Sequence, residues 1–287
     1  MTSSQYYNPT ISELRNTWEA TALGWAKWEP TISGGLVNAT EAMIDMAGIR
    51  PGMRVLDVGC GAGFLSLEAA ERVGPTGSVV ANDISPTMLL LLRVNAARAG
   101  LQNIETLECA AEDLDKAEGP FDAVICRLGL VLFVSKSKAL EAIQRVLKPG
   151  GRFAAIVFTS PENNLAMAQP MAILLRHSDR SGSTPRKTSR LFTLGSNGKL
   201  ESLMKDSGLT NVQTQTVQAR VQLRRAMDAM RMMQEAFGTY RATVADLSPE
   251  EQHRAWIDVH ECLQRFEIDG YIEMDLEFMI GAGAKPI

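Results

Sequence analysis

A short glycine-rich stretch, Val55–Leu65, constrains the fold more than any other part of the 287-residue chain. Apolar and β-branched residues lead to Asp57, glycines follow at every second position as Gly59, Gly61 and Gly63, and an amphipathic pattern begins at once. This order predicts a strand, a tight turn and a helix. Glycine allows positive φ angles and a close approach of a ligand, and the helix N-terminus presents free N–H groups. We therefore expect a cofactor-binding loop here.

The glycine spacing favours one kind of cofactor. A dinucleotide fingerprint reads G-x-G-x-x-G, whereas this loop reads G-x-G-x-G and has Phe64 where the dinucleotide pattern needs glycine. Asp57 suits an ammonium or sulfonium better than a pyrophosphate, because opposite charges attract. The sequence thus indicates a ligand that is cationic near the loop, and a nicotinamide-dependent oxidoreductase is the less favoured alternative.

The segment Asp57–Gly63 resembles the first motif of the class I S-adenosylmethionine-dependent methyltransferases. The resemblance implies an α/β fold, a Rossmann-like seven-stranded mostly parallel sheet with helices on both faces, and S-adenosylmethionine as the cofactor. It also implies that an acidic residue ending the second strand binds the ribose hydroxyls. Asp83 matches that position after the predicted strand Ser78–Asn82, and Ser85 and Pro86 suit the start of the next helix.

The same resemblance implies further binding positions. Cys109–Leu114 resembles the segment that touches adenine, but Ala110 replaces the common aspartate, so recognition would rest on main-chain groups near Ala111 and on Glu112. Arg127, at the end of the fourth strand, would bind a carboxylate of the cofactor or acceptor; the alternative is an ion pair with a nearby carboxylate such as Asp122. The candidate cofactor-binding residues are Asp57, Gly59, Cys60, Gly61, Asp83, Ile84, Met88, Ala111, Glu112 and Arg127.

Composition limits the partners and the compartment. Hydrophobic residues make up 45% of the chain and charged residues 22%, which is typical of a folded soluble protein. The net charge of −4 disfavours nucleic-acid binding, and with it an RNA methyltransferase. The polar N-terminus and the lack of a long apolar run indicate neither export nor a membrane span. The cysteines lack paired metal spacing, so we expect a cytoplasmic enzyme without a metal site: Cys60, Cys109, Cys126 and Cys262.

Residues 1–50 precede the first core strand and are expected to form a helical cap, with the methyltransferase domain over 51–287. A helix is predicted from Ile11 to about Lys27, with a break at Pro30, and a second over Val37–Ala47. One interpretation is a cap whose aromatic residues pack on the domain edge. The other is a lid that keeps water from the reacting methyl group, for which the candidates are Trp25 and Trp28.

Two helical insertions are expected around the acceptor, 161–200 after the fifth strand and 224–268 between the sixth and seventh. The first contains a polar, basic loop over Ser178–Arg190, which either is solvated or holds an anionic group of the acceptor. The second is far longer than a hairpin connection needs and would serve the acceptor site or a homodimer contact. Helical methionines commonly fill cores, but these could also line a large apolar pocket: Met167, Met171 and Met230.

Methyl transfer from a sulfonium needs few catalytic groups, because positioning and exclusion of water carry most of the rate. A base is needed only where the acceptor must lose a proton early. His177 is the candidate base, with a helix-terminal histidine stabilised by the dipole as the alternative. We expect methyl transfer to carbon or oxygen of a small apolar metabolite, in an enzyme similar in core to the ubiquinone/menaquinone biosynthesis methyltransferases. A methyltransferase fold repurposed for chemistry such as cyclisation stays open.

Overall fold

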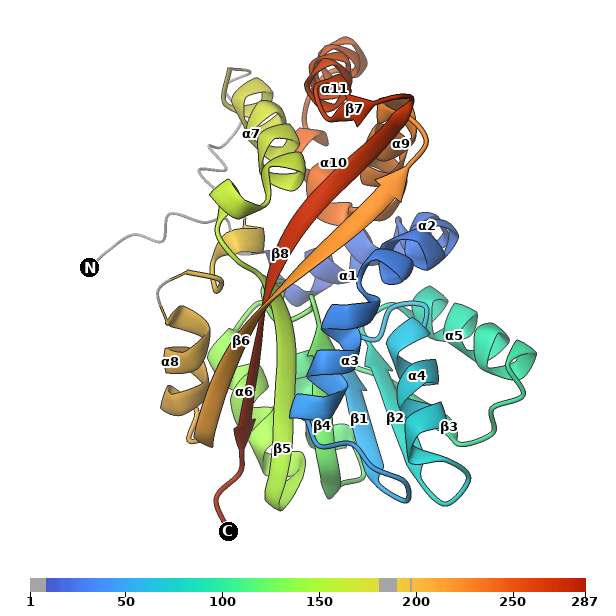
Figure 1. The fold of residues 1–287 in the computed structure, drawn as a ribbon, viewed down its shortest axis with the longest axis vertical. Helices are drawn as coiled ribbons and strands as arrows, with labels where there is room; N and C mark the ends of the chain where they lie inside the picture. Colours follow the sequence, from blue (N-terminus) through green and yellow to red (C-terminus); the bar gives the residue numbers. More distant parts are fainter. Residues whose placement is uncertain (1–8, 181–189, 197) are drawn as a thin grey trace.

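The computed structural model describes residues 9–180, 190–196 and 198–287 (Figure 1). At its centre lies an eight-stranded sheet with the order β3-β2-β1-β4-β5-β8-β6, to which β7 adds beside β8. The first five strands are parallel, and β6, β7 and β8 run antiparallel to their neighbours. The strands are β1 (Arg54–Val58), β2 (Ser78–Asp83), β3 (Ile104–Glu108), β4 (Phe121–Arg127), β5 (Leu147–Phe158), β6 (Thr210–Leu223), β7 (Glu267–Ile268) and β8 (Tyr271–Ala284).

This sheet confirms the expected α/β class and its mostly parallel order. The one addition is the two-residue β7, which pairs with the start of β8. The helices are α1 (Ile11–Glu19), α2 (Ala22–Gly35), α3 (Val37–Met46), α4 (Phe64–Val73), α5 (Pro86–Arg98), α6 (Lys136–Val146), α7 (Leu165–Arg180), α8 (Lys199–Asp206), α9 (Ala226–Ala236), α10 (Gly238–Val244) and α11 (Pro249–Gln264), with 3₁₀ turns η1 (Ala111–Lys116), η2 (Pro161–Asn163) and η3 (Arg190–Phe192).

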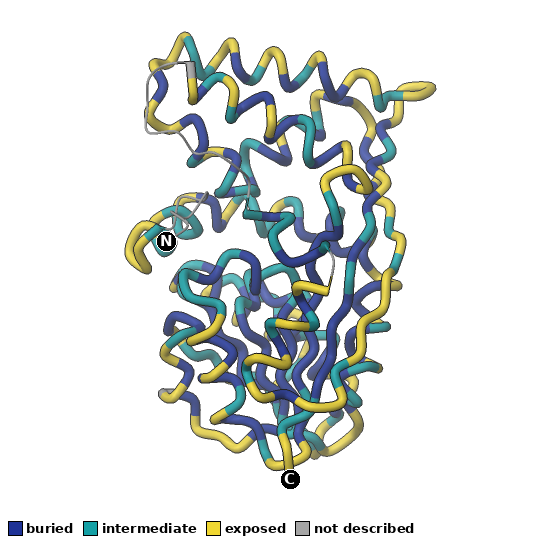
Figure 2. Tube along the Cα trace, turned by 90° about the vertical axis from the view of Figure 1, so that its left-hand side faces the viewer, coloured by how far each residue is buried: buried dark blue, intermediate teal, exposed yellow. Residues whose placement is uncertain are grey.

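All of these helices but α8, which packs against β6 and β8, form two groups. In Figure 1, α3, α4 and α5 lie in front of the parallel strands and α6 lies behind them. The other group, α1, α2, α7, α9, α10 and α11, gathers beyond the carboxyl ends of those strands, and we call it the helical layer. Figure 2 shows this layer stacked on the sheet, with buried chain running through both.

Two long strands join the helical layer to the sheet. β6 and β8 have 14 residues each and pair along nearly their whole length. They extend past the parallel strands and reach up among the helices (Figure 1). Burial alternates at the upper end of β8, where Ile272, Met274 and Leu276 face inward, which is the pattern of a strand covered on one side. The apolar face of the helical layer is therefore closed by strands of the same sheet.

The cap departs from the sequence prediction at one place. The helix was expected to break at Pro30, but Pro30 lies inside α2 and the break falls at Ala20 and Thr21. A proline removes only its own N–H from the helix ladder, and here the buried face of α2, with Ile32 and Ser33, fixes the helix by tertiary contacts. Thr21 instead leaves helical geometry and donates its hydroxyl to the main chain of α1.

The polar loop expected over Ser178–Arg190 is shorter than predicted at its start. Ser178–Arg180 continues α7, whereas 181–189 lie outside the described residues. None of the described helices combines the length and the apolar character needed to cross a membrane.

Candidate active site

The glycine loop between β1 and α4 has the backbone that its sequence predicts. Gly59, Gly61 and Gly63 have φ angles of 71°, 56° and 98°, which residues other than glycine rarely adopt. A Cβ at Gly61 would lie 2.9 Å from the indole Nε1 of Trp25, so the loop is also closely covered by α2. The loop therefore needs glycine for its turn and for the close approach of a neighbouring group.

Asp83 ends β2 directly beside this loop. Its Oδ2 accepts a hydrogen bond from Gly61 N at 2.9 Å, and its Oδ1 accepts one from Ser85 N at 2.9 Å. Ser85 in turn caps α5, with its hydroxyl accepting from Met88 N at 3.1 Å. The carboxylate is thus held rigidly between the glycine loop and a helix N-terminus, and a carboxylate oxygen has lone pairs left for a ligand.

A cavity of about 710 Å³ opens over the carboxyl ends of β1, β2 and β4, and we call it the glycine-loop cavity. Eight of the ten predicted cofactor-binding residues line it: Gly59, Gly61, Asp83, Ile84, Met88, Ala111, Glu112 and Arg127. Asp57 and Cys60 do not. Residues that sequence reasoning did not assign complete its wall, among them Leu14 and Trp18 of the cap, Asn82, and Leu128, Leu132 and Phe133 after β4.

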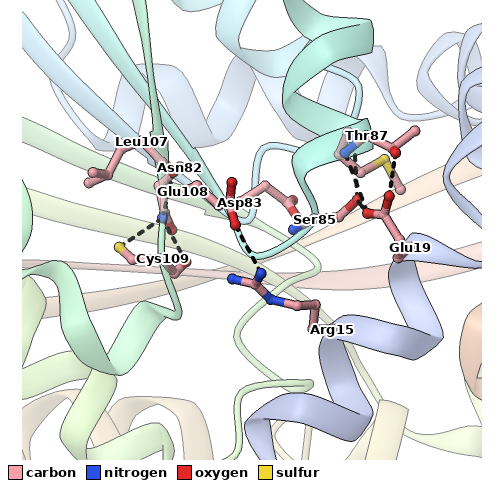
Figure 3. Close-up of polar contacts among 10 residues, drawn as sticks. Arg15, Glu19, Asn82, Asp83, Ser85, Thr87, Leu107, Glu108 and Cys109 are labelled. Atoms are coloured by element: carbon pink, nitrogen blue, oxygen red, sulfur yellow. Dashed lines mark hydrogen bonds and ion pairs between the residues drawn. The ribbon is translucent and has the colours of Figure 1, made fainter.

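The far end of the glycine-loop cavity is shaped by main-chain groups. Asn82 donates from Nδ2 to Leu107 O at 3.1 Å and to Cys109 O at 2.9 Å, which fixes the end of β3 (Figure 3). Glu112, predicted to touch adenine, uses Oε1 to accept from Ser135 N at 2.8 Å at the start of α6. Its carboxylate lines the cavity while already bound to a helix N-terminus.

Two contacts, each involving a carboxylate, hold helix α1 against the carboxyl ends of β2 and β3 (Figure 3). Arg15 pairs with Glu108 at the end of β3, with Nη1 and Oε1 2.9 Å apart. Glu19 accepts hydrogen bonds from the hydroxyls of Ser85 and Thr87 at the start of α5. Burial opposes the charge of Glu19, but these bonds lower its pKa below the usual value. Neither contact has a local sequence signal, because each joins the cap to a strand or helix far along the chain.

Arg127 pairs with the cap and not with Asp122. Its Nη2 lies 3.6 Å from Oε1 of Glu29 and donates to Ser33 Oγ at 2.9 Å, both on α2. Its Nη1 donates to Thr40 Oγ1 at 3.3 Å on α3. Asp122 was the wrong partner because it begins β4 whereas Arg127 ends that strand. Asp122 pairs instead with Lys148, at 2.6 Å.

Asp57 lies beneath the glycine loop and is fully buried. Its Oδ2 accepts from Ser66 Oγ at 2.6 Å, and its Oδ1 has no hydrogen-bond partner among the described residues. Burial raises the pKa of Asp57 to about 7, with Asp83 and Glu29 adding to the rise and Ser66 and Arg127 opposing it. Burial also raises the pKa values of Asp83 and Glu29. Burial around the glycine loop thus disfavours the ionised form of all three carboxylates.

A second cavity, of about 660 Å³, adjoins the first, and we call it the apolar cavity. Trp18, Trp25, Leu128 and Leu132 line both. The rest of its wall is almost entirely hydrocarbon and comes from the helical layer and from β5, η3, β6 and β8: Ile32, Leu36, Phe158, Met167, Leu191, Val221, Met232, Phe237, Thr239, Tyr240, Met274, Leu276 and Phe278. Tyr240 is fully buried, and its hydroxyl donates to Met167 O at 2.7 Å.

A third, more open cavity lies beside the apolar cavity, and we call it the mouth. It shares Leu132 and Thr239 with the apolar cavity, and Met171 and Arg190 are among its other lining residues. Of the predicted acceptor-site methionines, Met167 therefore lines the apolar cavity and Met171 the mouth, whereas Met230 lines neither.

Two predicted residues line neither the glycine-loop cavity nor the apolar cavity, and we call these two cavities the inner cavities. His177 pairs with Asp258 of α11, Nε2 to Oδ2 at 2.7 Å, and lines neither the glycine-loop cavity nor the apolar one. Trp28 donates from Nε1 to Glu235 Oε2 of α9 at 2.7 Å and also lines neither. The geometry therefore separates Trp25, on the wall shared by the cavities, from Trp28, which joins two helices.

Comparison with known proteins identifies the family. A family model described as a methyltransferase domain matches residues 49–216, more than half of the chain. The chain belongs to this family. Among the relatives of this chain is the ubiquinone/menaquinone biosynthesis C-methyltransferase UbiE of Ectopseudomonas mendocina, 40% identical over 136 residues. The match covers 47% of this chain and 53% of the relative, so the chain spans about half the length of the curated relatives it matches.

Solved structures share the fold of this chain over nearly its whole length. A phosphoethanolamine N-methyltransferase 2 of Haemonchus contortus, solved with S-adenosyl-L-methionine, matches with a TM-score of 0.60 and 17% identity, over 96% of this chain and 60% of that one. The [4+2]-cyclase SpnF matches with a TM-score of 0.59 and 16% identity, over 97% of both chains. These matches extend the likeness to the cap and insertions, at the level of the fold.

Proposed function

We propose that this methyltransferase transfers a methyl group from S-adenosylmethionine to a small apolar molecule. The observation that carries the proposal is the pair of adjoining cavities. One is lined by the glycine loop and Asp83, the other is almost wholly apolar, and the two share a wall formed by Trp18, Trp25, Leu128 and Leu132. A methyl donor in the first cavity would lie against an acceptor in the second.

The residues of the glycine-loop cavity suit S-adenosylmethionine. Asp83 would accept the ribose hydroxyls, since its carboxylate is already held in place by Gly61 and Ser85. Ile84, Met88 and the main chain at Ala111 would enclose the adenine. The buried, unpartnered Oδ1 of Asp57 indicates a region that favours positive charge near the loop. Together these groups fit a ligand with a polar sugar, an apolar base and a cationic end.

The bound cofactor supplies an electrophilic methyl group, and the protein's part is to align the acceptor and exclude water. The shared tryptophans and leucines do both, because they cover the glycine loop and form the wall of the apolar cavity. Tyr240 is not suited to act as a base: burial raises the pKa of its phenol, and its proton is donated to Met167 O. We therefore infer an acceptor whose nucleophilic atom needs little help from a protein base, such as an ionised hydroxyl or an electron-rich carbon.

The relatives agree with this class of acceptor. UbiE, as its name states, is a C-methyltransferase of ubiquinone and menaquinone biosynthesis. The family model matches residues 49–216, which include the glycine loop and the strands beside it, whereas the apolar cavity is formed in large part by the helical layer, most of which lies outside that range. We accordingly propose a small apolar acceptor without naming one, and methylation of carbon or oxygen.

The proposal is tested by incubating the purified protein with methyl-labelled S-adenosylmethionine and a cell extract separated into small-molecule, RNA and protein fractions. We expect label in an apolar small molecule, and mass spectrometry of that product identifies the acceptor. Asp83→Ala serves as the matched inactive control. Label confined to RNA or protein would contradict the proposed acceptor class, and failure to bind S-adenosylhomocysteine would contradict the cofactor.

A second candidate is a cofactor-binding fold that promotes a reaction such as cyclisation within the apolar cavity. It is favoured by the hydrocarbon lining of that cavity and by the likeness in fold to SpnF. The two candidates differ in one outcome: a cyclase converts its substrate without consuming S-adenosylmethionine, whereas a methyltransferase releases one S-adenosylhomocysteine per turnover.

Two expectations about partners stay predictions. The acidic composition predicts no nucleic-acid partner. A homodimer contact on the helical insertion 224–268 is supported by two exposed apolar side chains there, Ile257 and Ile268, and by Tyr271 just after it. Sedimentation of the protein over a range of concentrations tests the dimer.

A further inference from the structure

Three buried carboxylates surround the glycine loop, and they outnumber the guanidinium beside them. Asp57, Glu29 and Asp83 are 0%, 4% and 8% exposed. Arg127 lies 3.6 Å from Glu29 and acts on Asp57 as well, but this one guanidinium, the cation that the described residues place beside them, cannot balance three carboxylates. Buried charge without a partner is costly, so this arrangement favours a ligand that brings positive charge.

Glu29 is the unexpected member of this group, because it comes from the cap. It lies on α2, where burial raises its pKa and interactions with Arg127, Trp25 and the main chain of Phe64 at the start of α4 oppose that rise. The indole Nε1 still has no hydrogen-bond partner among the described residues. Phe64 directly follows the glycine loop, so the cap places a negative charge at the end of the loop where a helix N-terminus begins.

We propose that Glu29, together with Asp57, makes the glycine-loop cavity favour the cationic cofactor S-adenosylmethionine over its neutral product S-adenosylhomocysteine. This inference rests on the proposed function. The two molecules share adenine, ribose and a zwitterionic amino acid end, and they differ by one methyl group and the positive charge of the sulfonium. A negative field at the loop distinguishes the two molecules through the sulfonium, whereas Asp83 and the adenine wall act on parts that both molecules share.

The arrangement gives a physical reason for release of the product. When the methyl group leaves, the sulfonium becomes a neutral thioether, and the attraction of Glu29 and Asp57 for it disappears. Because Glu29 is held by α2, this part of the attraction exists only while the cap lies against the glycine loop. Exchange of product for fresh cofactor is then favoured by charge and not by a change in shape.

The test measures the affinities of S-adenosylmethionine, S-adenosylhomocysteine and sinefungin by calorimetry at pH 8, above the pKa of Asp57, without an acceptor. Sinefungin carries an ammonium in place of the sulfonium and cannot react. The variants are Glu29→Gln and Asp57→Asn, which remove charge at nearly constant shape. We expect each to lower the preference for the two cationic ligands over S-adenosylhomocysteine by about tenfold, the effect of one charge several ångströms away in a partly screened site.

Glu41→Gln is the matched control, because Glu41 is an exposed glutamate on α3 and its loss changes the net charge equally. We expect it to leave all three affinities in their wild-type ratio. Retained binding of S-adenosylhomocysteine by Glu29→Gln and Asp57→Asn shows that these variants are folded. A preference unchanged in both, or an equal loss for charged and neutral ligands, overturns the inference. Failure of the wild type to bind any of the three ligands would instead overturn the proposed function.

Discussion

The two inner cavities are built from different materials. The glycine-loop cavity combines apolar side chains with charged and hydrogen-bonded groups from short local segments, such as the loop itself and Asp83. The apolar cavity is formed by side chains from the cap, the helical insertions and the upper ends of β6 and β8, nearly all of them hydrocarbon. Binding of a polar cofactor can be specified by a few fixed atoms, whereas binding of an apolar molecule depends on the shape of many surfaces. The two cavities should therefore respond to different substitutions.

The largest expected effect is on the polar side of this comparison. Asp83→Ala removes the acceptor for the ribose hydroxyls and also the acceptor for the N–H of Gly61. Hydrogen bonds to a charged group contribute about 1.5–3 kcal/mol each. We expect the affinity for S-adenosylhomocysteine, measured by calorimetry, to fall by more than tenfold. Asp113→Ala, an exposed carboxylate in η1, is the control and should bind normally. Unchanged affinity in Asp83→Ala would remove the basis for the cofactor assignment.

Much of the glycine-loop cavity could be predicted from sequence because its charged and hydrogen-bonded groups lie in short local segments. Gly59, Gly61 and Gly63 indicate the turn by themselves, and Ser85 with Pro86 indicates where α5 begins. Parallel pairing of β1 with β2 then brings Asp83 to the loop, since carboxyl ends of neighbouring parallel strands meet at one edge. Eight of the ten assigned residues line the cavity for this reason.

The remaining contacts could not be predicted because they join distant segments. Glu29 and Arg127 are separated by almost a hundred residues, and nothing in either neighbourhood indicates the other. Sequence proximity suggested Asp122, which is at the wrong end of β4. The methionines show the same limit: Met167 and Met230 look alike in sequence, yet only the packing of α7 and α9 decides which of them reaches the apolar cavity.

On the apolar side, filling the space where the mouth and the apolar cavity share lining residues should slow transfer without affecting the cofactor. Thr239 lines both the mouth and the apolar cavity. Thr239→Trp places a large ring there, and we expect the rate of methyl transfer into the small-molecule fraction to fall by about tenfold or more while S-adenosylhomocysteine binds as before. Thr239→Val, which has nearly the same volume, is the control and should retain most activity. Normal transfer by the tryptophan variant would mean that the acceptor enters elsewhere.

The shared wall distinguishes the two lid candidates. Trp25 lines both cavities and lies against Gly61, whereas Trp28 bonds to Glu235 and lines neither. We expect Trp25→Ala to lower turnover by about tenfold, because water enters where the two ligands meet. Trp28→Ala should lower the melting temperature with a much smaller effect on turnover. Equal losses of turnover would show that the cap acts as one unit and that its two tryptophans are not separated in function.

The smallest expected effect concerns stability, whose dependence on pH should differ between Asp57 beneath the glycine loop and Tyr240 in the apolar cavity. The pKa of Asp57 is raised from 3.8 to about 7, so the native protein keeps a proton that the unfolded chain has lost between these values. Stability from this group therefore falls as the pH rises from about 4 to about 7. The side chain of the Asp57→Asn variant cannot ionise. Without ligand, we therefore expect the melting temperature of this variant, relative to that of the wild type, to be several degrees higher at pH 8 than at pH 5.

The apolar cavity supplies the control for that measurement. Tyr240→Phe leaves Met167 O without its donor, which costs about 1–3 kcal/mol of stability. Burial raises the pKa of the Tyr240 phenol, so it stays neutral in the native protein and this loss should be the same at pH 5 and pH 8. A loss for Tyr240→Phe that changed with pH as strongly as that for Asp57→Asn would mean that titration elsewhere dominates, and the stability difference could then not be assigned to the carboxylates beneath the glycine loop.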